Sequence, residues 1–153
     1  MSKMDAPAET ILPYEVTLHV RDNCLCLHVQ RAARALARRF DEALRPVGLT
    51  SGQFSLLMSL NRPDPPKIGE VSALLAMDRT TLTANLKPLE RRGFLVVSVD
   101  PRDKRSRRLI LTDEGRRALA AAYPYWEECQ AKLVSRFPGE DAARLLADLQ
   151  ALS

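Results

Sequence analysis

Apolar residues recur every three or four positions over the stretch from Asp22 to Leu44. The stripe consists of Leu25, Val29, Leu36, Phe40 and Leu44, and Ala32 or Ala33 fills the position between Val29 and Leu36. This spacing matches the α-helical turn and predicts an amphipathic helix, which Pro46 and Gly48 would end. The residues before it, 1 to about 20, show little periodicity and contain two prolines, so they predict a loose arm.

A second helix is predicted from Thr50, which with Gln53 has the spacing of a capping box. Its buried side would consist of Phe54, Leu57 and Met58. The prolines of "NRPDPP", residues 61–66, end it in a loop. A short helix would follow, with four apolar residues inward: Ile68, Val71, Leu74 and Leu75.

Asp78 is a suitable N-cap for a further helix that runs toward Arg92 and stops at Gly93. Two short helices joined by so brief a connection predict a helix-turn-helix unit. Pro88 removes one backbone hydrogen bond inside the second of these helices, so we expect a kink there and not a break.

The period changes to that of strands after Gly93. Residues 94–99 and 107–111 are rich in β-branched and other apolar side chains, and the charged, turn-forming segment 100–106 separates them, so a β-hairpin is predicted. Thr112 would cap a long helix with an apolar stripe of Leu119, Ala122, Trp126, Cys129 and Leu133. A last amphipathic helix presents Leu145, Leu146, Leu149 and Leu152.

These elements predict a mainly α fold with a small β-hairpin wing, the winged helix-turn-helix. We divide the chain into an arm (1–21), a helical dimerisation region (22–48 and 112–153) and a DNA-binding lobe (49–111). The Leu-rich faces of the terminal helices exceed what one small core can bury, which favours a homodimer.

The positive charge of the chain is concentrated in its middle third. Residues 67–117 contain 12 Lys and Arg against 7 Asp and Glu, while the remainder contains 11 against 12. A localised basic region is typical of proteins that bind a polyanion. The candidate contacts to double-stranded DNA on the helix are Arg79, Thr80, Thr81, Thr83, Asn85 and Lys87, and those on the wing are Asp103, Lys104, Arg105 and Arg107.

The segment "IGEVSALLAMDRTTLTANLKPLERRGFLVVSVDPRDKRSRRLILTDEG" resembles the MarR family of bacterial winged-helix regulators. The family's wing signature is matched by Asp103, Arg105, Leu111 and Thr112, after a Leu-Glu-Arg-Arg-Gly turn at 89–93. The resemblance implies a homodimer that binds a pseudo-palindromic operator, most simply as a repressor. It also implies that Arg105 enters the minor groove and that Asp103 supports it.

The same resemblance implies release from DNA by a small, aromatic or acidic ligand, or by cysteine oxidation. Four residues are candidates for a ligand pocket: Arg34, Phe40, Phe54 and Trp126. We find no glycine-rich phosphate loop and no paired carboxylates in an acid and base arrangement, so neither an enzyme nor a cofactor is expected.

The cysteines provide the alternative, a sensor of organic hydroperoxides. The sequence "DNCLC" is similar to the OhrR branch, which implies Cys26 as the reactive thiol and Cys129 as a resolving thiol, with Cys24 a further candidate. Phe40 and Ser51 stand where that branch has tyrosines. On one helix Cys24 and Cys26 would point to opposite sides.

A metal-responsive regulator is a weaker alternative. Cys24 and His28 share a helical face near His19, but no second matching pair completes a ligand set, so no metal is expected. The sequence also lacks an export signal and a long apolar run, so we expect a cytoplasmic protein with reduced thiols and no membrane partner.

Overall fold

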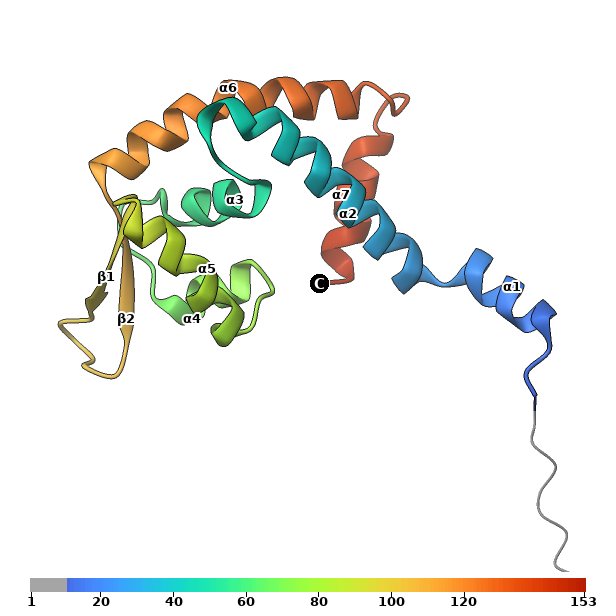
Figure 1. The fold of residues 1–153 in the computed structure, drawn as a ribbon, viewed down its shortest axis with the longest axis horizontal. Helices are drawn as coiled ribbons and strands as arrows, with labels where there is room; N and C mark the ends of the chain where they lie inside the picture. Colours follow the sequence, from blue (N-terminus) through green and yellow to red (C-terminus); the bar gives the residue numbers. More distant parts are fainter. Residues whose placement is uncertain (1–10) are drawn as a thin grey trace, which may run out of the picture. The chain divides into compact units, whose positions relative to one another are not determined.

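The structure is a computed structural model that describes residues 11–153 (Figure 1). In chain order its elements are α1 (Tyr14–Asn23), α2 (Leu25–Leu44), η1 (Arg45–Val47), α3 (Ser51–Leu60), α4 (Ile68–Leu74), α5 (Arg79–Arg91), β1 (Leu95–Val99), β2 (Arg107–Leu111), α6 (Asp113–Val134) and α7 (Asp141–Ala151). The chain divides into two compact units, one ending at Leu36 and the other running from Ala37 to Ser153, so α2 crosses the boundary.

The N-terminal segment differs from the prediction. The expected loose arm lies partly outside the described residues, but from Tyr14 it is helical, because Pro13 provides an extended N-cap and Glu15 an acidic first turn. The helix buries no residue within this chain. The helix predicted from Asp22 is also interrupted: Cys24 has extended backbone (φ −75°, ψ 108°) and α2 begins at Leu25. Cys24 and Cys26 therefore do not share one helix.

The C-terminal unit is built around a leucine-rich core to which α3, α4, α5, α6 and both strands contribute. The predicted capping box is confirmed, since Gln53 N–H donates to Thr50 Oγ1 and Thr50 N–H to Gln53 Oε1. Phe54 and Leu57 are buried as expected.

Two apolar residues that were predicted to face inward do not. Met58 is 42% exposed and Leu74 is 66% exposed. Leu56 and Leu60 supply the remaining buried contacts of α3, and α4 is only seven residues long, so Val71 alone is fully buried there. The chain turns immediately after α4, where Ala76 adopts a positive φ of 48°.

The helix-turn-helix unit is formed by α4 and α5. Asp78 caps α5 as predicted, because its Oδ1 accepts from Thr81 N–H (2.8 Å). The helix is continuous across Pro88 and buries Leu82, Leu86 and Leu89. Gly93, with φ 76°, follows its end.

The predicted hairpin is confirmed as two antiparallel strands whose register runs from Leu95↔Leu111 to Val99↔Arg107. An isolated bridge between Lys67 and Arg108 extends this sheet toward the segment before α4. Thr112 ties the hairpin to α6, since its hydroxyl accepts from Gly115 N–H (3.0 Å) and donates to Gly93 O (2.6 Å). These contacts join the hairpin to the start of α6 and to the segment before α4.

No helix within residues 11–153 combines the length and the apolar character that crossing a membrane requires.

Candidate nucleic-acid interface

One face of α5 is polar and exposed. Leu82, Leu86 and Leu89 fix the opposite face in the core, and their spacing leaves the residues between them outside. All six predicted contact residues of this helix are exposed: Arg79, Thr80, Thr81, Thr83, Asn85 and Lys87. The structure thus brings together every candidate that the sequence placed here.

Several of these side chains already make local contacts. Thr81 Oγ1 donates to Asp78 Oδ2 (2.7 Å), and Thr83 Oγ1 donates to Arg79 O (2.8 Å). These bonds hold the hydroxyl oxygens in fixed positions but leave them able to accept a hydrogen bond. The backbone N–H and hydroxyl of Thr81 also lower the pKa of Asp78, so the cap stays ionised.

The wing loop between β1 and β2 is folded by Asp103. Its Oδ1 accepts from Arg105 N–H (3.0 Å), and its carbonyl accepts from Ser106 N–H (2.9 Å). Arg107 adds two contacts from Nη1 to backbone carbonyls of the same loop, Lys104 O (3.1 Å) and Ser106 O (3.3 Å). Asp103 therefore contacts the backbone of Arg105, and the Arg105 side chain stays exposed.

A polar groove of about 620 Å³ separates the start of α5 from the wing. Its basic wall comes from three elements and consists of Lys67, Arg79, Arg105 and Arg107. Thr83 and Asp103 also line it. A basic groove between an exposed polar helix and a hairpin is typical of surfaces that bind nucleic acids.

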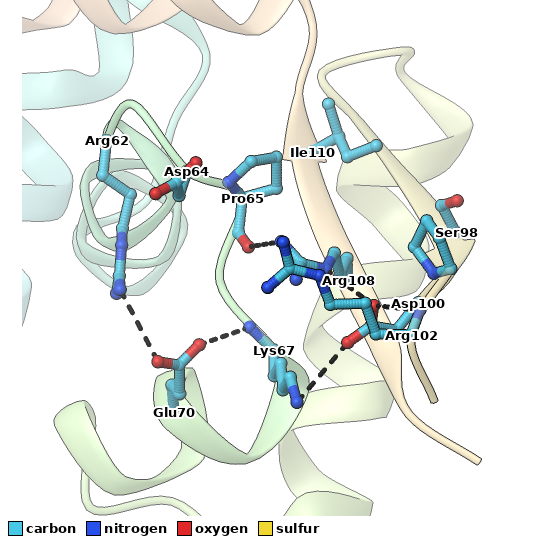
Figure 2. A pocket seen from close by; sticks show the side chains of 11 residues that line it. Arg62, Asp64, Pro65, Lys67, Glu70, Ser98, Asp100, Arg102, Arg108 and Ile110 are labelled. Atoms are coloured by element: carbon cyan, nitrogen blue, oxygen red, sulfur yellow. Dashed lines mark hydrogen bonds and ion pairs between the residues drawn. The ribbon is translucent and has the colours of Figure 1, made fainter. Parts of the chain in front are cut away.

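The base of the wing contains Asp100, a functional candidate that the sequence analysis did not single out (Figure 2). Its side chain is fully buried. Asp100 Oδ1 lies 3.2 Å from Arg108 Nε and accepts from Arg102 N–H (3.0 Å), while Oδ2 lies 3.4 Å from Lys67 Nζ. This carboxylate links the segment before α4, the wing loop and β2.

The surroundings of Asp100 favour its charged form. The hydrogen bond from Arg102 N–H is the largest cause that lowers its pKa, and Arg108 adds to this, while burial acts in the opposite sense. The net effect is a lowered pKa of Asp100. The signal available in the sequence was an aspartate directly before Pro101 in a turn rich in arginine.

Three of the four predicted pocket residues meet in the C-terminal unit. Trp126 stacks with Phe40 (6.5 Å between ring centroids), with Phe54 (6.0 Å) and with Tyr123 (5.9 Å). An open, mainly apolar cavity of about 360 Å³ adjoins this cluster and is lined by Phe54, Met58, Leu74, Leu75 and Trp126, with two serines. Arg34 belongs to the N-terminal unit.

The cysteines lie apart from the interface residues in the sequence and are free thiols. Cys26 is exposed, and its Sγ accepts from Gln30 Nε2 (3.2 Å), a neutral donor. Cys129 Sγ lies 3.9 Å from Arg39 O. Within residues 11–153 no three His, Cys, Asp or Glu side chains cluster as a metal site would.

The helix-turn-helix pair and the hairpin define a winged-helix protein. The family model of the MarR family matches residues 49–106. The Mycobacterium tuberculosis regulator MosR, solved in complex with DNA, is 38% identical with a TM-score of 0.76, over 85% of this chain and 96% of MosR. The repressor CouR, solved on a DNA duplex, is 30% identical with a TM-score of 0.77, over 87% of this chain and 94% of CouR. The chain belongs to the MarR family.

A curated relative, the transcriptional regulator HosA of Escherichia coli, is 35% identical over 95 residues, which are 61% of this chain and 69% of HosA. Against three others the chain spans 65%, 82% and 49% of their length. None of these relatives is named as an enzyme, and none of the similarities confirms the OhrR-like interpretation of the cysteine segment, which is not favoured.

Proposed function

We propose that this protein is a sequence-specific DNA-binding transcriptional regulator that acts as a homodimer, most simply a repressor that occludes a promoter. The observation that carries the proposal is the groove between α5 and the wing, with its polar helix face and its four basic side chains. The solved DNA complexes of MosR and CouR support the same use of this fold.

The two halves of the interface would have different tasks. Side chains of α5 would reach base edges in the major groove, where Arg79 can read guanine and Asn85 adenine. The wing would follow the backbone, with Arg105 in the minor groove and Lys104 and Arg107 near phosphates.

A homodimer would bury apolar side chains that one chain leaves exposed. In α7 these are Leu145, Leu146, Leu149 and Leu152, and in α1 and α2 they include Tyr14, Val20, Leu25 and Leu36. Exposed apolar residues in such number usually mark an interface. A twofold dimer would present two copies of α5 to half-sites about one helical turn apart.

We further propose a small aromatic or acidic ligand as the effector. The cavity beside Trp126 has an apolar lining of the kind that binds an aromatic ring, and its volume lies within the range of small-molecule sites. CouR, 28% identical in its complex with p-coumaroyl-CoA, binds a ligand with an aromatic ring. Arg34 would meet the acidic group if the dimer brings it near.

The experiment that tests the proposal is footprinting of the purified protein on the DNA upstream of its own gene. We expect protection of a pseudo-palindromic segment with two half-sites about 10 base pairs apart. The absence of any protected segment, in the presence of non-specific competitor DNA, would contradict the proposed function.

A further inference from the structure

The outer face of the hairpin carries a second polar cavity, which adjoins the groove beside α5 (Figure 2). It has a volume of about 590 Å³ and is lined by the loop between α3 and α4, the outward residues of both strands and the base of the wing. Ser98 and Ile110 contribute to its lining from the sheet face opposite the buried Leu95 and Leu109.

Four basic side chains line this cavity, Arg62, Lys67, Arg102 and Arg108, together with three acidic ones, Asp64, Glu70 and Asp100. Lys67 and Arg108 both pair with the fully buried carboxylate of Asp100. Their own side chains are 46% and 24% exposed, respectively. Arg108 is fixed further, since Nη1 donates to Pro65 O (3.3 Å). A buried carboxylate that orients cations toward an open cavity is an arrangement suited to binding an anion.

The guanidinium groups of the pocket have N–H donors that could bind such an anion. Nη2 of Arg108 has no hydrogen-bond partner among residues 11–153, and neither does any side-chain nitrogen of Arg102. Arg62 makes one long contact with Glu70 (3.7 Å). The planar guanidinium groups match the oxygen atoms of a phosphate group better than a lysine does.

We propose that this cavity, which we call the wing-base pocket, binds a phosphate group. The pocket shares Lys67 and Glu70 with the groove beside α5, so a backbone phosphate of DNA that continues past the wing is the favoured source. A free phosphate-bearing molecule offers the same chemistry and is the other source. The DNA form of this inference rests on the proposed function, but the pocket's affinity for phosphate does not.

The first arm of the test uses free protein and inorganic phosphate. Amide resonances of residues 98–108 would be followed by NMR during a phosphate titration at constant ionic strength, with chloride as the control anion. We expect saturable shifts with phosphate, and their loss in Arg102→Gln. This arm gives its result even if the protein binds no DNA.

The second arm uses DNA and the salt dependence of affinity. If Arg102 meets a backbone phosphate, Arg102→Gln should reduce the slope of log K against log[salt] by about 0.9. Arg116→Gln is the matched control, because Arg116 is an exposed arginine on α6 that pairs with Asp113 (3.1 Å). A shorter duplex that lacks the flanking base pairs contacted by the wing should give the same slope for wild type and Arg102→Gln.

The outcomes separate the two sources. A reduced slope supports a DNA phosphate, and saturable phosphate binding with an unchanged slope supports a free phosphate-bearing ligand. If phosphate acts no differently from chloride and Arg102→Gln behaves as Arg116→Gln does, the proposal is overturned.

Discussion

Arg105 stands in the wing loop with its side chain exposed, while Asp103 and the backbone around it fix its position. Replacing Arg105 with alanine should therefore remove a DNA contact and leave the fold unchanged. A charge-assisted contact contributes about 1.5–3 kcal/mol, so we expect a loss of roughly tenfold to a hundredfold in operator affinity. Fluorescence anisotropy would measure the operator affinity. If Arg105→Ala binds as tightly as Arg116→Ala, Arg105 does not contact the DNA.

Asp100 gives the wing a dependence on pH. Because its folded pKa is lowered, the ionised form stabilises the native state at neutral pH, and this contribution is lost as the pH falls through the folded pKa. Asp100→Asn should lower the melting temperature at pH 7 by several degrees, since Lys67 and Arg108 lose their buried partner.

The matching pH experiment distinguishes this role from simple packing. Between pH 7 and pH 3 the melting temperature of the wild type should fall more steeply than that of Asp100→Asn, so the difference between the two proteins should narrow in acid. Parallel curves over that range would show that the charge of Asp100 does not stabilise the wing.

At the scale of elements, the junction between the hairpin and α6 is closely packed around Gly115. A Cβ added at Gly115 would lie 2.1 Å from Phe94 O and 2.7 Å from Leu111 Cδ1. Gly115→Ala should therefore lower the free energy of unfolding by about 1–3 kcal/mol, measured by urea denaturation. Gly52→Ala is the control, because nothing lies within 4 Å of its added Cβ. Equal stability of the two variants would contradict the packing described for this junction.

The sequence predicted the elements of the lobe well because each carries a local signal. Thr50, Asp78 and Thr112 are caps, Gly93 is a stop, and both strands were placed within a residue of their observed bounds. The candidate contacts of α5 were chosen as the polar and basic side chains of the second helix, and all six are exposed.

The elements that were missed depend on contacts that a sequence pattern does not carry. Helix α1 buries no residue within this chain, so no core contact supports the weak pattern of its apolar residues. Met58 and Leu74 line the open cavity beside Trp126, to which residues of α3, α4 and α6 contribute, and no single helix pattern shows that cavity. The partners of Asp100 likewise include Lys67, which is 33 positions away in the sequence and pairs with Arg108 of β2 through an isolated bridge.

At the scale of the whole molecule, the exposed leucines of α7 predict self-association. Leu145→Glu with Leu149→Glu should shift the sedimenting species from a dimer toward the 17.1 kDa chain, because each substitution places a charge in an apolar contact. Val96→Glu, on the outer face of the hairpin, is the control and should remain dimeric. A wild type that sediments as a single chain at micromolar concentration would contradict the homodimer.

The most direct test of the central proposal, sequence-specific DNA binding, is an anisotropy titration. Two labelled duplexes of equal length and composition would be compared at physiological salt, one from the DNA upstream of the gene and one with the same bases scrambled. We predict affinity for the upstream duplex greater by on the order of 10³ or more, because α5 would read base edges and not only phosphates. Equal affinity for the two duplexes would contradict the account.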